Sequence, residues 1–253
     1  MIPNLPRLFT DADNTLWETD GVFAEAQLTM LQEIQDALAL SDVPEKNRGL
    51  EFLRQIDQRI AASHPDHLRY PPGLLAEGLA RAIQGEDSSA AADAVATQDT
   101  HDPRFNAIVN SFVERLHKVP PLRVGVRETF DAISVIGVPI TVVTEGASAR
   151  VAEVLKAHQL DRYVERVISA RKTVEFFEDI RSDEGRRRCL MVGDQLDRDI
   201  AFSQRAGFET FYFAGAFRPY WHDDSIVTPN HEITRYDQII PFLQPEIGDH
   251  FAF

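Results

Sequence analysis

Residues 8–17 read Leu-Phe-Thr-Asp-Ala-Asp-Asn-Thr-Leu-Trp, a short apolar run that leads directly into two carboxylates. Asp11 and Asp13 stand two positions apart, where strand alternation gives way to a loop. Both side chains are therefore expected to project into the crevice at the carboxyl ends of the strands, where open α/β sheets bind ligands. Taken alone, this pattern fits a metal site and a solvated acidic turn equally, so the remaining strands have to decide between them.

Four further apolar runs have the length and character of buried strands, and helical periodicity follows most of them. The runs span residues 138–144, 164–169, 189–192 and 210–213. Apolar residues recur at three- and four-residue intervals in 124–134, 147–158 and 197–206. A final strand at 232–233 and a closing helix at 237–243 complete the pattern. Strand–helix alternation predicts an α/β fold with a parallel sheet.

The stretch between the first two strands has a different character, because it contains amphipathic helical patterns and no convincing strand. The helical patterns span residues 22–40, 49–62, 73–84 and 104–118. The polar, Ala-rich segment 84–100 fits either a short helix between loops or a mobile connection. Roughly 130 positions separate Asp11 from Thr144, whereas a strand–helix–strand unit takes about 30 residues. About 100 residues are therefore inserted after the first strand, and they are expected to form a helical domain.

Composition excludes several classes of function. Twenty-six Lys and Arg stand against forty Asp and Glu, and the net charge of −14 repels nucleic acid and anionic membranes. The only cysteine, Cys189, rules out an intrachain disulfide and a cysteine-cluster metal site. No apolar run approaches the roughly 18 residues of a membrane-spanning helix. We expect a cytoplasmic protein that binds neither nucleic acid nor membrane; the sequence does not specify its oligomeric state.

Polar residues follow three more of the predicted strands. Thr144 ends the second strand just before Glu145-Gly146, where a hydroxyl and backbone N–H groups can meet an anion, although a helix cap by Thr144 or Ser148 explains the pattern as well. Lys172 follows the third strand, with Arg171 as a competitor for the same role. The fourth strand ends in GDQLDRD (193–199), whose carboxylates suit a hard divalent cation. Because all four groups fall at carboxyl ends of successive strands, a shared site is favoured over independent surface features.

In this order, the four segments resemble the motifs of the haloacid dehalogenase superfamily. The matching segments are DADNTLW (11–17), VVTEG (142–146), the stretch around Lys172, and GDQLDRD. The resemblance covers most of the chain outside the insertion. It implies a Rossmann-like core formed by residues 1–17 and 120–253, and a helical type-one cap formed by residues 18–119. Such a cap closes over the site, excludes water and selects the leaving group.

The resemblance also implies the chemistry. Asp11 would attack phosphorus to form an aspartyl-phosphate, and Asp13 would protonate the leaving alcohol and then activate water. Thr144 would bind the phosphoryl group, while Lys172 would neutralise it and orient Asp11. An acid at position 13 is found in the phosphatases and phosphomutases of the superfamily and is missing from its dehalogenases and phosphonatases. The expected activity is therefore hydrolysis of a small-molecule phosphate monoester.

The same resemblance implies a Mg²⁺ site. Its ligands would be Asp11, the backbone carbonyl of Asp13, and Asp194, with Asp199 assisting through water or through Lys172. The cation screens the phosphoryl oxygens so that an anionic carboxylate can approach. The chain departs from the commoner motifs at two positions, where Thr173 replaces a proline after the lysine and Glu145 replaces an asparagine before the glycine.

Two other functions stay open at this point: a phosphomutase with the same motifs, and a catalytically silent binding or regulatory protein. A receiver-like signalling domain is disfavoured, because its phosphorylated acid ends a middle strand and no large cap follows.

Some residues outside the motifs are also candidates for a functional role. Four in the insertion are suited to a polar leaving group, although an exposed turn is the simpler interpretation: His64, His67, Arg69 and Tyr70. Trp17 fits a substrate-facing role or, more simply, packing at a domain junction. The metal-capable residues near the end of the sequence match no compact zinc spacing: His222, Asp223, Asp224, His231 and Glu232.

Overall fold

The computed structural model describes residues 5–39, 46–65, 70–98, 100–216 and 225–244. The chain divides into two compact units. One contains Met1–Asp20 and Val119–Phe253, and the other contains Gly21–Lys118. Residues 67, 69 and 222–224, which include several of the candidates named above, lie outside the described residues.

The first unit contains a six-stranded parallel sheet in the order β3-β2-β1-β4-β5-β6. The strands are β1 Arg7–Thr10, β2 Ile140–Thr144, β3 Val164–Ser169, β4 Cys189–Gly193, β5 Glu209–Tyr212 and β6 His231–Glu232. From β1 the chain moves outward through β2 and β3, and then returns to place β4 on the other side of β1. This reversal is the topological switch point at which open α/β sheets bind ligands, so it lies beside the end of β1. The predicted α/β class is confirmed.

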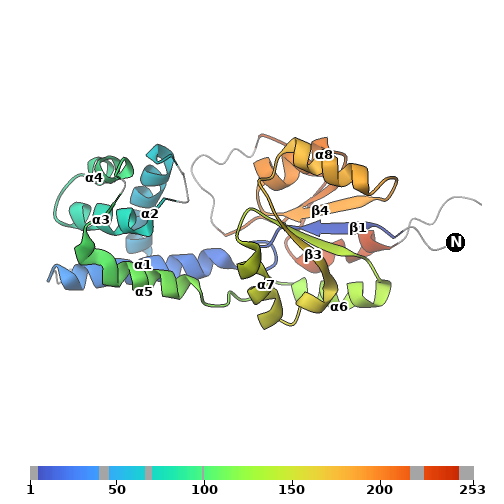
Figure 1. The fold of residues 1–253 in the computed structure, drawn as a ribbon, viewed down its shortest axis with the longest axis horizontal. Coiled ribbons are helices and arrows are strands. Elements are labelled where there is room, and N and C mark those ends of the chain that lie inside the picture. The colour runs from blue at the N-terminus through green and yellow to red at the C-terminus, as the bar shows by residue number, and fades with distance from the viewer. Residues whose placement is uncertain (1–4, 40–45, 66–69, 99, 217–224, 245–253) are drawn as a thin grey trace, which may run out of the picture. The chain divides into compact units, whose positions relative to one another are not determined.

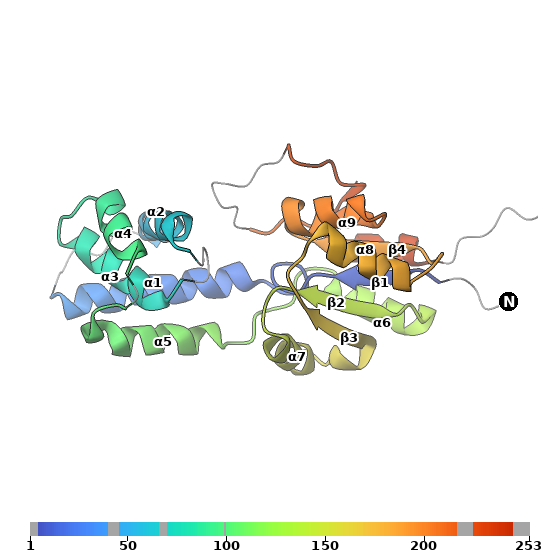
Figure 2. The same cartoon turned by 45° about the horizontal axis from the view of Figure 1, so that its top comes forward.

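Alternating residues of β1 face opposite sides of the sheet, and each side is covered by helices. Leu8 packs in the larger cluster with Phe130 and Ile133, whereas Phe9 packs in a second cluster, with its ring centroid 5.2 Å from that of Phe208. Helices α6 (Val126–Ile136) and α7 (Ser148–Ala157) lie on one face, and α8 (Val174–Asp183) and α9 (Phe202–Arg205) on the other (Figures 1 and 2). Burial on both faces explains why β1, β2, β4 and β5 read as apolar runs. The edge strand β3 (VERVIS), predicted as a buried strand, is partly exposed.

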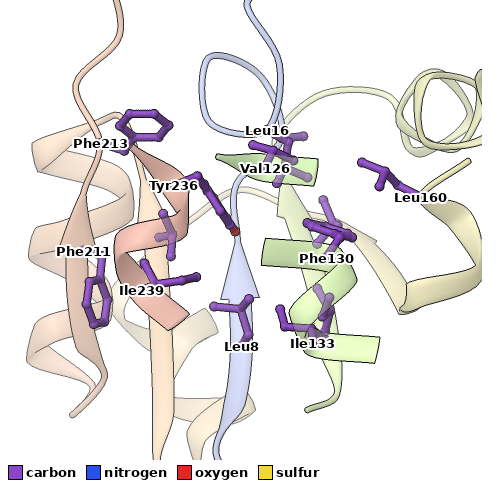
Figure 3. Packing of buried hydrophobic residues seen from close by; sticks show 14 of the residues in the cluster. Leu8, Leu16, Val126, Phe130, Ile133, Leu160, Phe211, Phe213, Tyr236 and Ile239 are labelled. Carbon is purple, nitrogen blue, oxygen red and sulfur yellow. The ribbon is translucent and has the colours of Figure 1, made fainter. Parts of the chain in front are cut away.

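The C-terminal element of the described sheet unit is η5 (Tyr236–Leu243), where the sequence predicted a closing helix, and it is of the 3₁₀ type. Pro241 lies inside it and has no N–H to donate to a preceding turn, which favours a short, irregular helix. Its apolar residues still complete the core: Figure 3 shows Leu8 of β1 between Ile239 of η5 and Ile133 of α6.

The second unit is entirely helical within its described residues. It contains most of α1 (Thr19–Ala37) together with α2 (Lys46–Ser63), α3 (Pro72–Ile83), α4 (Ser88–Ala96), η2 (Pro103–Phe105) and α5 (Asn106–Leu116). The helices enclose their own apolar core, to which Ile34, Leu53 and Phe112 contribute. The Ala-rich segment contains a helix, α4, because the Asp87 carboxylate accepts hydrogen bonds from the first free N–H groups of Ser89 and Ala90.

The segment after β4 differs from the regular helix expected there. It begins as a π-helix, η4 (Leu196–Ala201), and continues as the single turn of α9. A π-turn widens the helix locally, and such turns are frequent at functional sites. Among the described helices, none is both long enough and apolar enough to cross a membrane.

Candidate active site

Three carboxylates meet at the carboxyl edge of the sheet. Asp11 follows β1, Asp194 follows β4, and Asp199 comes from η4, with one carboxylate oxygen of each lying within 4.8 Å of the others. The pairing of β1 with β4 brings the first two together, since Asp11 N donates to Val192 O at 2.9 Å. Asp199 is fully buried and Asp11 is 7% exposed. The structure therefore gathers the three predicted acids into one enclosed cluster.

Gly193 makes room for this cluster. A Cβ atom built on Gly193 would lie 2.2 Å from Cβ of Asp199, far inside van der Waals contact. Asp199 is also held by the backbone, because its Oδ2 accepts from Gln195 N at 3.1 Å. The glycine before Asp194 is thus required by a close approach between the strand end and the π-helix.

Lys172 supplies the positive charge at the centre of the cluster. Its Nζ donates to Asp11 Oδ1 and, at 2.5 Å, to Asp199 Oδ1, and its side chain is only 5% exposed. Burial opposes the charge on Lys172, but the two carboxylates outweigh burial and raise the pKa of Lys172 above its ordinary value. Arg171, its competitor in the sequence, is exposed.

Two acids of the cluster, Asp11 and Asp194, hold protons more tightly than free carboxyls do. Burial raises the pKa of Asp11 to about 7; Lys172 lowers it in part, and the neighbouring charge of Asp199 raises it again. Burial, followed by the charges of Asp11 and Asp199, also raises the pKa of Asp194 well above its usual range. Three carboxylates around one ammonium leave an excess of negative charge, which a divalent cation would neutralise.

One carboxylate oxygen of the cluster has no hydrogen-bonding partner among the described residues. It is Oδ1 of Asp194, which is buried. A buried carboxylate oxygen without a donor costs free energy unless a cation binds it. Hard cations such as Mg²⁺ prefer oxygen ligands, and this set of side chains offers only oxygen. The donor set therefore fits a magnesium ion.

Asp13 and Thr144 flank Gly146 on the same edge of the sheet. A Cβ atom built on Gly146 would lie 3.2 Å from Thr144 Oγ1 and 3.5 Å from Asp13 Oδ2. The hydroxyl of Thr144 accepts from Gly146 N at 2.9 Å. The N-cap residue of α7 is Ala147, which makes no side-chain cap hydrogen bond, so neither Thr144 nor Ser148 is the cap. The other oxygen of Asp13, Oδ1, accepts from Trp17 Nε1 and from Thr19 Oγ1, each at 2.9 Å.

Asn14 shapes the loop that carries Asp11 and Asp13. Its backbone has a φ of 55°, a left-handed conformation that asparagine tolerates better than most residues. Its side-chain oxygen accepts from the backbone N–H groups of Thr19 and Asp20 at the start of α1. The side chain thus closes the loop and caps the helix that follows.

Two residues hold the loops of the site in place and were not predicted from the sequence as functional residues. Arg123 donates to the backbone carbonyls of Asn14, Phe213 and Ala214, and its guanidinium lies 3.4 Å from the centroid of the Phe213 ring. Glu145 accepts from Lys172 N at 2.9 Å and pairs with Arg198 of η4. Glu145 was noticeable as a departure from the motif, but no sequence pattern marks Arg123.

Two of the suggested substrate-reading residues, His64 and Tyr70, lie within the described part of the helical unit. Tyr70 is buried in the core of the helical unit, where its hydroxyl donates to Asp57, so the exposed-turn interpretation is wrong for this residue. The His64 ring lies 6.1 Å from the Tyr70 ring. Near the end of the described chain, His231 Nε2 lies 2.8 Å from Glu209 Oε1, within the sheet unit.

The sequence matches the family profile of the haloacid dehalogenase-like hydrolases over residues 7–207. The chain belongs to this family of hydrolases. The resemblance seen in its motifs is thereby confirmed, and the match includes each of the four strand-end segments. A search of curated proteins gave no match.

Solved structures of this family share the fold at low sequence identity. YfnB, a hydrolase from Bacillus subtilis bound to magnesium, superposes with a TM-score of 0.61 at 15% identity, over 94% of this chain and 98% of that one. A predicted phosphoglycolate phosphatase from Haemophilus somnus gives 0.60 at 16% identity, over 96% and 100%. A 2-haloacid dehalogenase from Pseudomonas syringae gives 0.50 at 20% identity, over 94% and 97%. These likenesses establish the fold, and they include both phosphatases and dehalogenases.

Proposed function

We propose that this hydrolase is a Mg²⁺-dependent phosphatase that cleaves a small-molecule phosphate monoester through an aspartyl-phosphate on Asp11. The observation that carries the proposal is the second acid, Asp13, whose Oδ2 lies beside Thr144 and Gly146. Release of an alcohol from phosphate needs a proton donor for the leaving oxygen, whereas displacement of a halide does not. An acid held at this position therefore favours phosphate esters over haloacids.

In the first step, a carboxylate oxygen of Asp11 attacks phosphorus and the bond from phosphorus to the alcohol oxygen breaks. Asp13 gives its proton to that oxygen, so the alcohol leaves neutral. In the second step, Asp13 takes a proton from the water that attacks the aspartyl-phosphate, and phosphate leaves with Asp11 regenerated. One residue thus acts as acid and then as base, which returns the enzyme to its starting state.

Lys172 and Thr144 prepare Asp11 and the phosphoryl group for these steps. The hydrogen bond from Lys172 Nζ to Oδ1 of Asp11 favours the ionised form of the nucleophile and fixes its orientation. The hydroxyl of Thr144 and the N–H of Gly146 lie together at the end of β2 and suit the oxygens of a phosphoryl group.

The metal ligands in this proposal are Asp11, the backbone carbonyl of Asp13, and Asp194, whose unpartnered oxygen is the best-prepared ligand atom. A bound Mg²⁺ would supply positive charge to the phosphoryl oxygens, so that the carboxylate of Asp11 could approach the anionic ester. Asp199 has both of its oxygens engaged, by Lys172 and by Gln195 N, which supports a role through Lys172 or through a water molecule rather than as a direct ligand.

The helical unit is proposed as the cap that selects the leaving group. Its residues 21–118 are inserted between the loop of Asp13 and β2 and carry a core of their own. A lid of this kind excludes water before phosphoryl transfer. We also propose a cytoplasmic location, in which the single thiol of Cys189 stays reduced.

The test is phosphate release from a panel of monoesters by purified protein with Mg²⁺ or with a chelator. We expect Mg²⁺-dependent phosphate release by the wild type, no turnover by Asp11→Asn, and a phosphorylated peptide containing Asp11 after acid quenching. Isomerised sugar phosphate without free phosphate would instead identify a phosphomutase, and halide release from a 2-haloacid would identify a dehalogenase. A protein that is inactive on the whole panel would favour the silent binding protein.

A further inference from the structure

We propose that Trp17 is a positioning residue: its indole N–H holds one carboxylate oxygen of Asp13 and thereby reserves the other oxygen for proton transfer. This inference rests on the proposed phosphatase function, in which Asp13 is the acid and then the base. The sequence favoured packing alone for Trp17. The packing is present, since the side chain is 1% exposed, but the indole also donates to Asp13 Oδ1 at 2.9 Å.

The backbone fixes Trp17 from two sides. Trp17 forms an isolated bridge with Asp13 and a second one with Leu122. On either side of it, Glu18 N donates to Pro121 O at 2.9 Å, and Arg123 N donates to Leu16 O at 3.0 Å. Residues 16–18 therefore run hydrogen-bonded beside residues 121–123 within the sheet unit. An indole held by this pairing and by the apolar core offers its N–H from a fixed position.

The polarity of this hydrogen bond decides which oxygen of Asp13 carries the proton. An indole N–H can only donate, whereas a hydroxyl such as that of Thr19 can donate or accept. A proton on Oδ1 would face the indole N–H and would cost the Trp17 hydrogen bond. The proton of the acid form is therefore directed to Oδ2, which lies towards Gly146 and Thr144.

Asp13 needs this restraint because its side chain is exposed. In water, a carboxyl group rotates freely and exchanges its two oxygens. A general acid that spends part of its time with the proton turned away loses part of its rate advantage. Trp17 and Thr19 together hold the carboxyl in the one orientation that delivers the proton from Oδ2 to the leaving oxygen as the P–O bond breaks.

The test compares two substrates that differ only in how much they need that proton. Phenyl phosphate releases phenolate, a strong base that needs protonation, whereas p-nitrophenyl phosphate releases a weakly basic phenolate that leaves without it. The quantity measured is kcat/KM with Mg²⁺, because it reports the step in which the alcohol leaves. We expect Trp17→Phe to lower kcat/KM roughly tenfold more for phenyl phosphate than for p-nitrophenyl phosphate, a part of the total acid contribution of about 10²–10⁴.

Phe130→Leu is the matched control, because Phe130 is a fully buried aromatic of the same cluster that makes no hydrogen bond to Asp13. It should lower kcat/KM equally for both substrates. Thr19→Val, which removes the second donor to Oδ1, should reproduce the selective loss, and it carries the comparison if Trp17→Phe fails to fold. Equal losses on both substrates in Trp17→Phe and Thr19→Val would overturn the inference and leave the phosphatase standing. A wild type inactive on both substrates would overturn the proposed function itself.

Discussion

Replacing Lys172 by methionine tests the charge balance of the site most directly. The substitution keeps a long apolar side chain but removes the ammonium that lies between Asp11 and Asp199. Removing one partner of a buried ion pair costs about 3–5 kcal/mol, because the remaining charge is left uncompensated. For a chain of this size each kcal/mol shifts Tm by about 2–4 °C, so a fall of roughly 6–20 °C is expected in metal-free protein.

The pH of the measurement determines where in this range the result falls. The pKa of Asp11 is already raised to about 7 with the lysine present, and it rises further without it. At pH 6 the variant takes up a proton and relieves part of the repulsion. At pH 8 holding that proton costs more free energy, so the loss of stability should be larger at pH 8. Added Mg²⁺ should restore more stability to the variant than to the wild type, since the cation then meets an uncompensated cluster.

Arg171→Met is the control, since Arg171 is the adjacent cation and its side chain is exposed. It should change the free energy of unfolding by no more than about 0.5 kcal/mol. The assay is urea unfolding with a chelator present, repeated for Lys172→Met/Asp199→Asn, in which removal of one carboxylate should recover part of the loss. A Lys172→Met protein as stable as Arg171→Met at pH 8 would refute the buried pair and the assignment of Lys172 over Arg171.

Three further predictions concern other contacts. Gly193→Ala places a Cβ 2.2 Å from Asp199 Cβ. The free energy of unfolding in urea should fall by about 1–3 kcal/mol, and most of the turnover should be lost. An unchanged kcat would contradict the close approach. Burial raises the pKa of Asp57 above 3.8, so the folded state holds a proton that the unfolded state releases. Unfolding free energy should therefore fall as pH rises from about 4 through the folded pKa, and Asp57→Asn should flatten that slope. Arg123→Lys keeps the charge but replaces the planar guanidinium fork, which spans carbonyls of two loops, with a compact ammonium. A loss of roughly 2 kcal/mol is expected in urea unfolding, and unchanged stability would show that the fork is dispensable.

The parts of the fold that could be predicted from the sequence are those written in local patterns. The inner strands of the sheet were predicted because burial on both faces demands an apolar run, as in residues 189–192. The ends of those runs placed Asp11, Thr144, Lys172 and Asp194 at one edge, since parallel strands end together. The type of helix that a segment forms depends on contacts with residues far away in the sequence, and no local pattern predicts it. The π-turn of η4 replaced the start of the regular helix that periodicity predicted over 197–206, and the 3₁₀ type of the closing helix had no sign in the sequence.

Tyr70 shows why a polar cluster in the sequence was misinterpreted. Histidines, an arginine and two prolines around it have the composition of an exposed turn, yet the ring is buried and its hydroxyl donates to Asp57. A tyrosine packs its ring into a core when a partner for the hydroxyl lies within reach. That partner is 13 positions earlier in the sequence, on α2, and only the packing of the helices brings the two together.

Glu145 illustrates how a departure from a family motif is explained by the structure around it. The glutamate stands where asparagine is commoner, and its carboxylate links three strand-end segments: its own loop, the Lys172 loop through the N–H of Lys172, and η4 through Arg198. Burial raises its pKa, but the N–H of Lys172 and the charge of Arg198 outweigh burial and lower the pKa overall, so the link is ionised at neutral pH. Lys172 is thus held at its backbone by Glu145 and at its ammonium by Asp11 and Asp199. The lysine position does not need a following proline to fix it, which accounts for both departures, Glu145 and Thr173, with one set of contacts.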